Sequence, residues 1–192
     1  MTDARPMPML RGERVWLRPL EKADVVEAVM DDAELAHYAG FKVPFAPESQ
    51  ERWFSKQLEQ TGETTFQFVV CPLGSRERIG GCGLRSIDRV NGDAELSIFM
   101  FRGSWGMGLG TDAVNALLDF GFGELRLERI YLQVFDYNPR AMRSYQKSGF
   151  VQEAVLRRAR FHRGAHHDVI LMAILRHEWD ALPRKRAWEY GQ

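Results

Sequence analysis

The residues best suited to chemistry lie in a glycine-rich segment, Trp105-Gly106-Met107-Gly108-Leu109-Gly110-Thr111, between an apolar stretch and a helical pattern. Glycines at alternate positions let the backbone approach a ligand closely. The free N–H groups and the dipole at the start of a helix favour an anion such as a pyrophosphate. The segment therefore predicts a phosphate cradle, and a tight turn without a ligand is the alternative.

The glycine spacing argues against two common phosphate-binding motifs. A Walker A loop ends in Lys-Ser or Lys-Thr, which this segment lacks. A Rossmann fingerprint requires G-x-G-x-x-G, whereas the glycines here follow G-x-G-x-G. Nucleotide hydrolysis and hydride transfer both lose support.

A second motif follows the first after a predicted helix and strand. It reads Asn138-x-x-Ala141-x-x-Ser144-Tyr145-x-x-x-Gly149-Phe150. Together the two segments resemble motifs A and B of the GNAT N-acetyltransferase superfamily, in which R/Q-x-x-G-x-G/A binds the coenzyme A pyrophosphate. Trp105 stands where the family has Arg or Gln, and the W-G-x-G loop resembles the ribosomal-protein (RimJ/RimL-like) branch and related polyamine enzymes. The resemblance covers about residues 10–175.

The resemblance implies an α/β (α+β) fold with acetyl-CoA as cosubstrate. Its central twisted sheet of about six to seven strands is mixed, mostly antiparallel and flanked by helices, and its fourth and fifth strands splay apart. The pantetheine arm lies in that gap and pairs with the backbone of the fourth strand like an added strand. The residues expected to bind acetyl-CoA are Ile98, Phe99, Met100, Trp105, Gly106, Met107, Gly108, Leu109, Gly110, Thr111, Asn138, Ala141 and Tyr145.

The predicted reaction is direct attack of a primary amine on the thioester in a ternary complex, where positioning supplies much of the acceleration. An alkylammonium has a pKa near ~10, so a base helps, and Glu95 on the predicted fourth strand is the candidate. The alternative for Glu95 is a solvated or Arg-paired carboxylate. Tyr145 stands where many family members present a hydroxyl to the sulfur, and aromatic packing is its alternative. Asn138 is also a helix N-cap candidate.

The elements that must position these residues follow from hydrophobic periodicity and turn signals. Asn91-Gly92 predicts a type I′ turn, and Asp31-Asp32 marks a break in the first helical stretch. We expect a single domain over 1–192, with its core at about 10–175 and a basic tail at 176–192. Strands are predicted over 13–20, 64–71, 78–87, 94–101, 128–135, 150–158 and 168–175, and helices over 21–38, 47–60, 111–122, 138–149 and part of 177–188.

Composition and charge limit the partners. The 26 basic and 26 acidic residues give zero formal net charge, so no global field attracts nucleic acid or an anionic membrane. The first ten residues lack the apolar region of a signal peptide, and no apolar run reaches the ~20 residues of a membrane span. We therefore expect a cytoplasmic protein with no nucleic-acid or membrane partner.

Four smaller groups receive a structural interpretation. Cys71 and Cys82 are expected to be reduced and buried, and Cys82 lacks an evident His partner for nucleophilic catalysis. The histidines beside Asp168, which are His162, His166 and His167, are expected at the surface of a hairpin, so no metal is predicted. Arg184-Lys185-Arg186 is expected to be a solvated helix end.

Three classes of function remain open: an acetyltransferase, a coenzyme-A-binding sensor without turnover, and a structural module with a glycine turn. The enzyme is favoured because Glu95 and Tyr145 occur where the chemistry needs them. The acceptor groove is expected from the N-terminal helices, which carry Tyr38, Phe41, Trp53 and Phe54. A protein N-terminus, a polyamine, an aminoglycoside and other small amines are the candidate acceptors, and the family resemblance also admits a homodimer.

Overall fold

The computed structural model describes residues 10–26, 32–40 and 47–190, and its seven strands form one sheet in the order β1-β2-β3-β4-β5-β7-β6. Neighbouring strands run antiparallel except for the parallel pair of β4 and β5. This confirms the predicted mixed, mostly antiparallel sheet. The strands are β1 (Val15–Pro19), β2 (Thr65–Pro72), β3 (Gly80–Asp88), β4 (Asp93–Met100), β5 (Arg129–Phe135), β6 (Val151–His162) and β7 (Ala165–Leu175).

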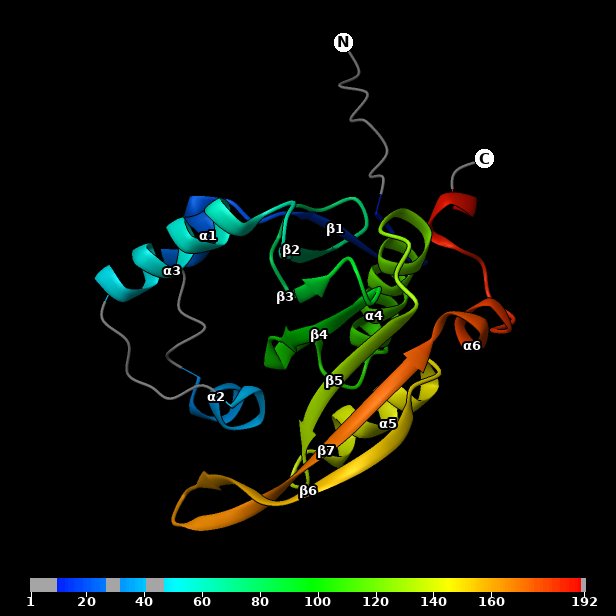
Figure 1. Ribbon diagram of the computed structural model, residues 1–192. Coiled ribbons are helices and arrows are strands. Elements are labelled where there is room, and N and C mark those ends of the chain that lie inside the picture. The colour runs from blue at the N-terminus through cyan, green and yellow to red at the C-terminus, as the bar shows by residue number, and fades with distance from the viewer. Residues whose placement is uncertain (1–9, 27–31, 41–46, 191–192) are drawn as a thin grey trace.

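Helices lie on both faces of the sheet (Figure 1). Helix α4 packs on β1, β3 and β4, and α5 packs on β5 and on α4. On the other face α3 contacts β2 and α2 contacts β4, while α1 packs against α3. The helices are α1 (Lys22–Val26), α2 (Ala33–Ala39), α3 (Pro47–Gln60), α4 (Leu109–Asp119), α5 (Pro139–Lys147) and α6 (Arg176–Asp180), with a π-helical turn at Phe120–Glu124 and 3₁₀ turns at Arg102–Ser104 and Ala187–Glu189.

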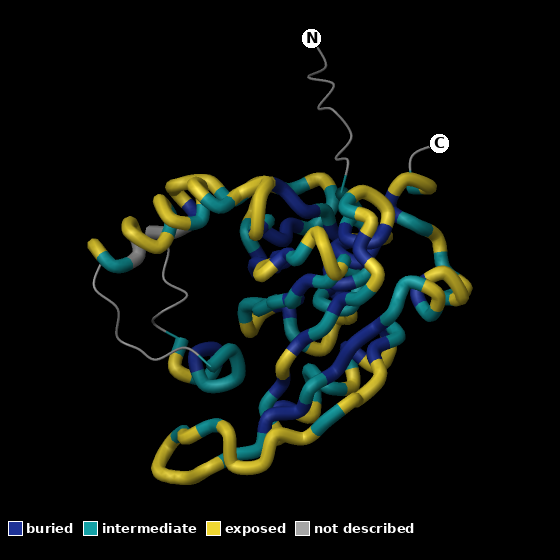
Figure 2. The backbone as a smooth tube through the Cα atoms, viewed as in Figure 1, coloured by how far each residue is buried: buried dark blue, intermediate teal, exposed yellow. Residues whose placement is uncertain are grey.

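Strand alternation separates the core from the functional face. Leu84 and Leu96, which are register partners on β3 and β4, are buried in the core cluster that includes Ala113 and Leu117 of α4. The dark blue, buried stretches of the tube follow this central layer (Figure 2). Residues an odd number of positions from Leu96 along β4, such as Ser97 and Phe99, point to the opposite face of the sheet, on the side of α1–α3.

The predicted type I′ turn at Asn91-Gly92 is wrong. A type I′ turn needs positive φ at both central residues, and only Gly92 has it here, with φ 71°. Instead, the Asp88 carboxylate accepts the N–H groups of Val90 (2.8 Å) and Asn91 (2.9 Å). The Asp88 carbonyl accepts the Gly92 N–H at 2.8 Å. A side-chain turn therefore replaces the two-residue hairpin.

The C-terminal tail packs on the core through Arg184 and Arg186, so the predicted solvated helix end at 184–186 is wrong for these two residues, while Lys185 is exposed. These residues lie between α6 and the last 3₁₀ turn. Buried Asp119, the last residue of α4, accepts hydrogen bonds from Arg184 (2.6 and 2.9 Å), from the Trp179 indole (2.9 Å) and from the Ala187 N–H (2.7 Å). Because a buried carboxylate must be paired, Asp119 joins the tail to the helix that opens at the glycine loop.

Asp112, in the first turn of α4, fixes the start of β1 to the same helix. Its carboxylate accepts the consecutive backbone N–H groups of Glu13, Arg14 and Val15 at 3.0, 2.9 and 3.0 Å. The Arg14 guanidinium in turn donates to the Met107 carbonyl at 2.6 Å. The N-terminal edge of the sheet is thus hydrogen-bonded to the glycine loop.

Candidate active site

The predicted splay between β4 and β5 is present. The two strands pair only at Asp93↔Arg129, Ala94↔Ile130 and Glu95↔Tyr131. Beyond Glu95, β4 continues beside β3 as far as Met100, and β5 continues beside β7 as far as Phe135. One edge of β4 therefore faces a gap in which an extended ligand can add as a strand.

The register shows which backbone groups face the gap. The Phe101 N–H donates to the Ile79 carbonyl on the β3 side at 2.9 Å. Because backbone direction alternates along a strand, the N–H and C=O groups of Phe99 also face β3, while those of Ile98 and Met100 face the gap. Of the three predicted strand-adding residues, Ile98 and Met100 have the required backbone direction, and Phe99 offers its side chain to the other face.

The glycine loop has the geometry of a helix-opening anion cradle. Gly106 (φ 75°) and Gly108 (φ 78°) adopt left-handed conformations that favour glycine. Helix α4 begins at Leu109, two residues earlier than predicted, because Gly108 is its N-cap. The N–H groups of Leu109, Gly110 and Thr111 occupy its first turn, where an α-helix provides no internal acceptor. These groups suit an anionic ligand such as a pyrophosphate.

The Trp105 side chain is held by contacts with three other parts of the protein. Its indole N–H donates to the Met100 carbonyl at 2.6 Å, so it joins the loop to the end of β4. The Arg140 guanidinium lies 3.6 Å from the Trp105 ring centroid, and Tyr38 meets the same ring edge-on at 5.9 Å. Trp105 therefore holds a cation from α5 beside the loop, in contact with α2.

Asn138 acts as the N-cap of α5, as predicted. Its side-chain oxygen accepts the Ala141 N–H at 3.2 Å, and its amide nitrogen donates to the Tyr38 carbonyl at 3.5 Å. Farther along α5, the Ser144 hydroxyl lies 2.8 Å from the Thr111 hydroxyl of α4. The two motif helices are thus connected at the cavity wall.

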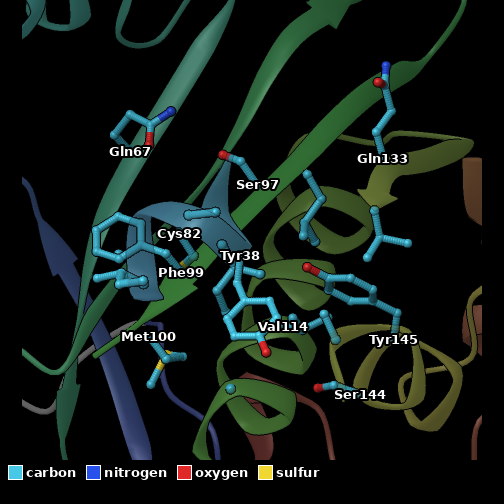
Figure 3. Close-up of a pocket in the computed structure, with 18 of the residues that line it drawn as sticks. Tyr38, Gln67, Cys82, Ser97, Phe99, Met100, Val114, Gln133, Ser144 and Tyr145 are labelled. Atoms are coloured by element: carbon cyan, nitrogen blue, oxygen red, sulfur yellow. The ribbon is translucent and has the colours of Figure 1, made fainter. Parts of the chain in front are cut away.

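Tyr145 is buried in α5 and lines the cavity. Its ring packs against Phe150 with a centroid separation of 5.9 Å, and its hydroxyl end is directed into the cavity (Figure 3). Burial raises the pKa of Tyr145 to about 12, because the charged phenolate is poorly solvated there. The hydroxyl therefore stays protonated at neutral pH and is available as a hydrogen-bond donor.

Glu95 lies at the last paired position before the splay and lines the same cavity. Its carboxylate forms an ion pair with Arg85 at 2.6 Å, and 14% of its side chain is exposed. In this structure Glu95 is therefore paired with an arginine, and its role as a base stays a prediction. The same position places the carboxylate at the entrance of the gap, within the part of the cavity that faces α1–α3.

One cavity of about 1100 Å³ connects these features. All predicted site residues line it except Met107, whose side chain is exposed, and Leu109, whose side chain is in the core. Of the predicted acceptor-groove residues, Tyr38 and Trp53 also line it and Phe54 does not, whereas Phe41 lies outside the described residues. The sequence prediction did not include Gln67, Ser97, Gln133, Arg140 and Arg143, which line the cavity as well.

Some of these residues have a local signal in the sequence and others do not. Arg140 follows Asn138 by two residues, so its place in motif B is a usable signal. Gln133 alternates with the buried residues Leu132 and Val134 of β5, and Figure 3 shows it at the cavity wall. Ser97 and Gln67 have no local signal, because only the pairing of β2, β3 and β4 brings them to one face.

The cysteines and His162 have structural roles. Cys71 and Cys82 are free and buried, and burial raises the pKa of both thiols, which disfavours a thiolate nucleophile. His162 lies on the β6–β7 hairpin, with its Nε2 2.6 Å from the Nδ1 of His37 in α2. The described residues contain no group of three or more His, Cys, Asp or Glu side chains that is able to hold a metal ion. Among them there is also no helix long and apolar enough to cross a membrane.

A splayed β4–β5 pair, a glycine loop opening a helix and a tyrosine in the facing helix define a coenzyme-A-dependent acyltransferase site. The model of the acetyltransferase (GNAT) domain family matches residues 14–151. An uncharacterized N-acetyltransferase p20 from Bacillus licheniformis is 33% identical over 178 residues, which cover 90% of this chain and 99% of that protein. Spermidine N(1)-acetyltransferase from Escherichia coli K12 is 32% identical over 174 residues, covering 89% and 91%.

Solved structures agree with the family match. The crystal structure of spermidine N-acetyltransferase from Vibrio cholerae in complex with CoA and spermine superimposes with a TM-score of 0.79 at 28% identity, covering 86% of this chain and 97% of that one. The chain belongs to the GNAT acetyltransferase family. It is an acetyl-CoA-dependent N-acetyltransferase, and the comparisons give no support to a sensor without turnover.

Proposed function

We propose that this enzyme binds acetyl-CoA along the open edge of β4 and acetylates a primary amine that enters from the α1–α3 side of the cavity. The observation that carries the proposal is the splay of β4 and β5 beside the buried hydroxyl of Tyr145. This arrangement gives the thioester one defined channel, with the glycine loop at one end and Glu95 near the other.

The proposed cofactor contacts follow the channel. The first-turn N–H groups of α4 bind the pyrophosphate, and Arg140 and Arg143 of α5 supply positive charge at the cavity wall. The backbone groups of Ile98 and Met100 pair with the pantetheine amides. Trp105 competes with this pairing at one point, because its indole N–H occupies the Met100 carbonyl.

In the proposed chemistry the amine nitrogen attacks the thioester carbonyl carbon, so a C–N bond forms and the C–S bond breaks. The incoming ammonium loses a proton to Glu95, directly or through water, before attack. The Tyr145 hydroxyl donates a hydrogen bond to the sulfur as negative charge develops on it. The second nitrogen proton leaves after attack, and the products are the N-acetylated amine and coenzyme A.

The test measures thiol release from acetyl-CoA with and without an added amine, together with the mass of the product. Because two relatives described above are spermidine N-acetyltransferases, spermidine belongs in the first acceptor panel, beside an aminoglycoside and short peptides. Thiol release that requires an amine and yields its acetylated product supports the proposal. Thiol release at the same rate without any amine contradicts it.

Two further expectations stay predictions. A homodimer is tested by sedimentation equilibrium, where a monomer at micromolar concentration would contradict it. A cytoplasmic location is tested by fractionation of the source cells.

A further inference from the structure

Three uncharged polar side chains, which we call the polar row, cross the acceptor side of the cavity. Gln67 of β2 is the register partner of Gly83 on β3, and Gly83 is the register partner of Ser97 on β4. On β5, Gln133 lies two residues beyond the last pair of β4 and β5, as Ser97 does on β4. Gln67, Ser97 and Gln133 therefore occupy one level of the sheet, and Figure 3 shows them at the cavity wall.

Gly83 gives the Gln67 side chain its place in the polar row. A Cβ atom on Gly83 would lie 2.6 Å from the side-chain oxygen of Gln67 and 2.4 Å from the backbone oxygen of Phe66. The Gln67 amide therefore lies across the bare backbone of β3, on the side of Ser97. Its nitrogen donates to the Thr65 hydroxyl at 3.4 Å, and among the described residues the amide forms no other hydrogen bond. One N–H group and the oxygen of this amide thus remain for a ligand.

Helix α3, which contacts β2, brings the same chemistry to the cavity. Trp53, Gln57 and Gln60 line it at positions i, i+4 and i+7, which lie on one face of a helix. Small-molecule sites combine apolar and aromatic walls with a few polar groups that fix the ligand's orientation. Here those polar groups are amides and a hydroxyl, which donate and accept hydrogen bonds and carry no charge.

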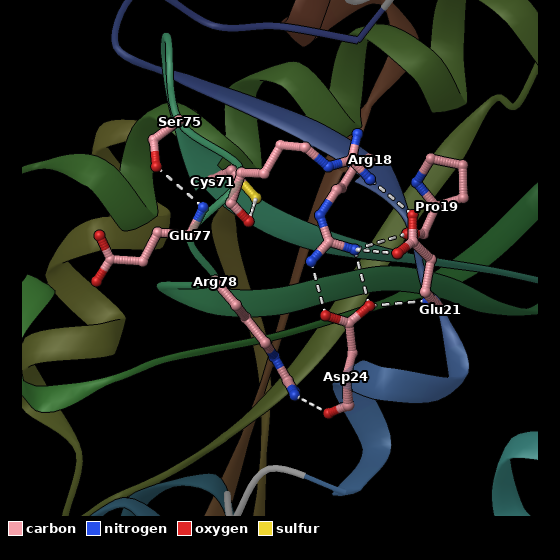
Figure 4. A network of polar contacts seen from close by, with 9 residues as sticks. Arg18, Pro19, Glu21, Asp24, Cys71, Ser75, Glu77 and Arg78 are labelled. Carbon is pink, nitrogen blue, oxygen red and sulfur yellow. Dashed lines mark hydrogen bonds and ion pairs between the residues drawn. The ribbon is translucent and has the colours of Figure 1, made fainter.

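The carboxylates beside the polar row are already paired. Within the described part of the chain, Asp24 and Glu95 are the only carboxylates that line the cavity. Glu95 is bound to Arg85 at 2.6 Å. The buried Arg18 guanidinium binds Asp24 at 2.6 and 2.7 Å, and the Glu21 N–H adds a bond at 2.8 Å (Figure 4).

Asp24 is ionised, and its charge is matched by Arg18. Burial alone would raise the pKa of Asp24, but the hydrogen bonds from Arg18 and Glu21 hold this pKa below its usual value. An acceptor with several ammonium groups would have to break the Asp24 and Glu95 pairs to find a counter-charge within the described walls. The site therefore favours an acceptor with a single ammonium group and an uncharged body.

The extent of the polar row indicates the shape of that body. Neighbouring strands lie about 4.8 Å apart, and successive residues on one face of a strand lie about 7 Å apart. From Gln67 to Ser97 the row spans two strand spacings, whereas along β4 it ends at Glu95 in one direction and at Phe99 in the other. A polar surface that is wider across the strands than along them suits a ring with hydroxyls around its edge better than an extended chain.

We propose that the acceptor is an amino sugar of hexose size with a single amine, with its hydroxyls on Gln67 and Ser97 and its amine beside Glu95. This rests on the proposed function for the reaction itself, in which the C–N bond replaces the C–S bond and the products are the N-acetylated sugar and coenzyme A. A site that hydrogen-bonds substrate hydroxyls discriminates strongly against an analogue without them, because its own polar groups are then left unpaired.

The experiment uses methyl hexopyranosides with one amine on ring carbon 2, 3 or 4, beside cyclohexylamine, which keeps the ring and the amine and lacks the hydroxyls. Spermidine and triglycine amide complete the panel. Values of kcat/KM are expressed per unprotonated amine, so that differences in amine pKa do not enter. We expect the best sugar isomer to exceed cyclohexylamine by at least a hundredfold and to exceed spermidine and the peptide as well.

Variants test the two residues that carry the inference. Gln67→Met and Ser97→Ala should each lower kcat/KM for the best sugar about tenfold, or about 1.4 kcal/mol, through a higher KM, and leave that for cyclohexylamine unchanged. Gln152→Met is the matched control, because Gln152 is exposed on β6 and does not line the cavity.

Three results would overturn the inference: no sugar isomer preferred over cyclohexylamine, spermidine or the peptide preferred over every sugar, or an unchanged preference in folded Gln67→Met and Ser97→Ala. If a variant does not fold, the comparison of acceptors in the wild-type enzyme still decides. Calorimetric titration of the sugars and cyclohexylamine into the coenzyme-A-loaded protein measures the preference without turnover. Absence of turnover with every amine would therefore refute the proposed function, while the binding preference would still test the polar row.

Discussion

Tyr145→Phe removes one oxygen from the cavity wall and keeps the ring that packs against Phe150. The pKa of Tyr145 is raised to about 12, whereas a free thiol has a pKa near ~8.5. Complete proton transfer from the tyrosine to a departing thiolate would therefore be uphill. The hydroxyl is expected to act as a hydrogen-bond donor to the developing thiolate, and the proton that yields the free thiol comes from solvent.

The size of the effect follows from this role. A hydrogen bond to a charged group contributes about 1.5–3 kcal/mol, so kcat should fall by roughly 10- to 150-fold, with coenzyme A affinity nearly unchanged. Because Tyr145 stays neutral until the pH approaches about 12, the ratio of wild-type to variant turnover should be constant between about pH 6 and 10.

The assay is pre-steady-state thiol release from acetyl-CoA, which isolates the chemical step from product release. Tyr137→Phe serves as the control, because Tyr137 carries a buried hydroxyl but does not line the cavity. Unchanged single-turnover chemistry in Tyr145→Phe would show that the residue only packs. A parallel collapse of coenzyme A affinity would show that it holds the cosubstrate instead.

Three further changes test the site and its support. Gly108→Val should weaken coenzyme A binding more than tenfold, or about 1.4 kcal/mol, as measured by calorimetry. Gly74→Val is the control, because Gly74 has φ 79° in a remote turn, so the substitution imposes similar backbone strain and should leave coenzyme A binding unchanged. Equal losses of affinity in both variants would reject the role of the glycine loop in binding the pyrophosphate. Glu95→Gln should lower turnover about a hundredfold near pH 7 and by less at high pH, where the free amine is already present. A pH profile of turnover that coincides with that of the parent enzyme would show that Glu95 is not the base. Asp119→Asn should lower the free energy of unfolding, measured in urea, by about 3 kcal/mol, because its buried hydrogen bonds lose their charged acceptor. The control is Asp180→Asn, which replaces an exposed carboxylate and should change the free energy of unfolding little. Similar losses in the two variants would refute the role of Asp119.

The parts of the site that depend on neighbouring residues are predictable from the sequence. The Asn138 cap, the left-handed glycines of the loop and the opening of α4 are local, since each is decided within a few positions. The same holds for α3, whose predicted and observed bounds coincide at Pro47–Gln60. The turn after Asp88 failed as a prediction because a side-chain acceptor competed with the backbone preference of Asn-Gly.

The remaining features depend on pairs distant in sequence. Arg140 reaches Trp105 only because α5 lies beside the glycine loop, and Arg184 reaches Asp119 only after the tail has crossed the end of α4. The two residues of each pair lie too far apart in the sequence for a motif or a periodicity to connect them. The backbone direction of Phe99 likewise depends on the pairing of β3 with β4, which joins residues distant in sequence.

The three hydrogen bonds that Asp112 accepts from the backbone of residues 13–15 have a consequence for how fast the cosubstrate binds. They connect the loop to a strand edge, so the loop is ordered before the ligand arrives and little conformational entropy remains to be lost on association. The amide hydrogens of Glu13, Arg14 and Val15 should therefore exchange with deuterium in step with those of the first turn of α4. The Asp112→Ala variant should bind coenzyme A with a slower association rate, because the loop would adopt its binding-competent conformation in only a fraction of the molecules.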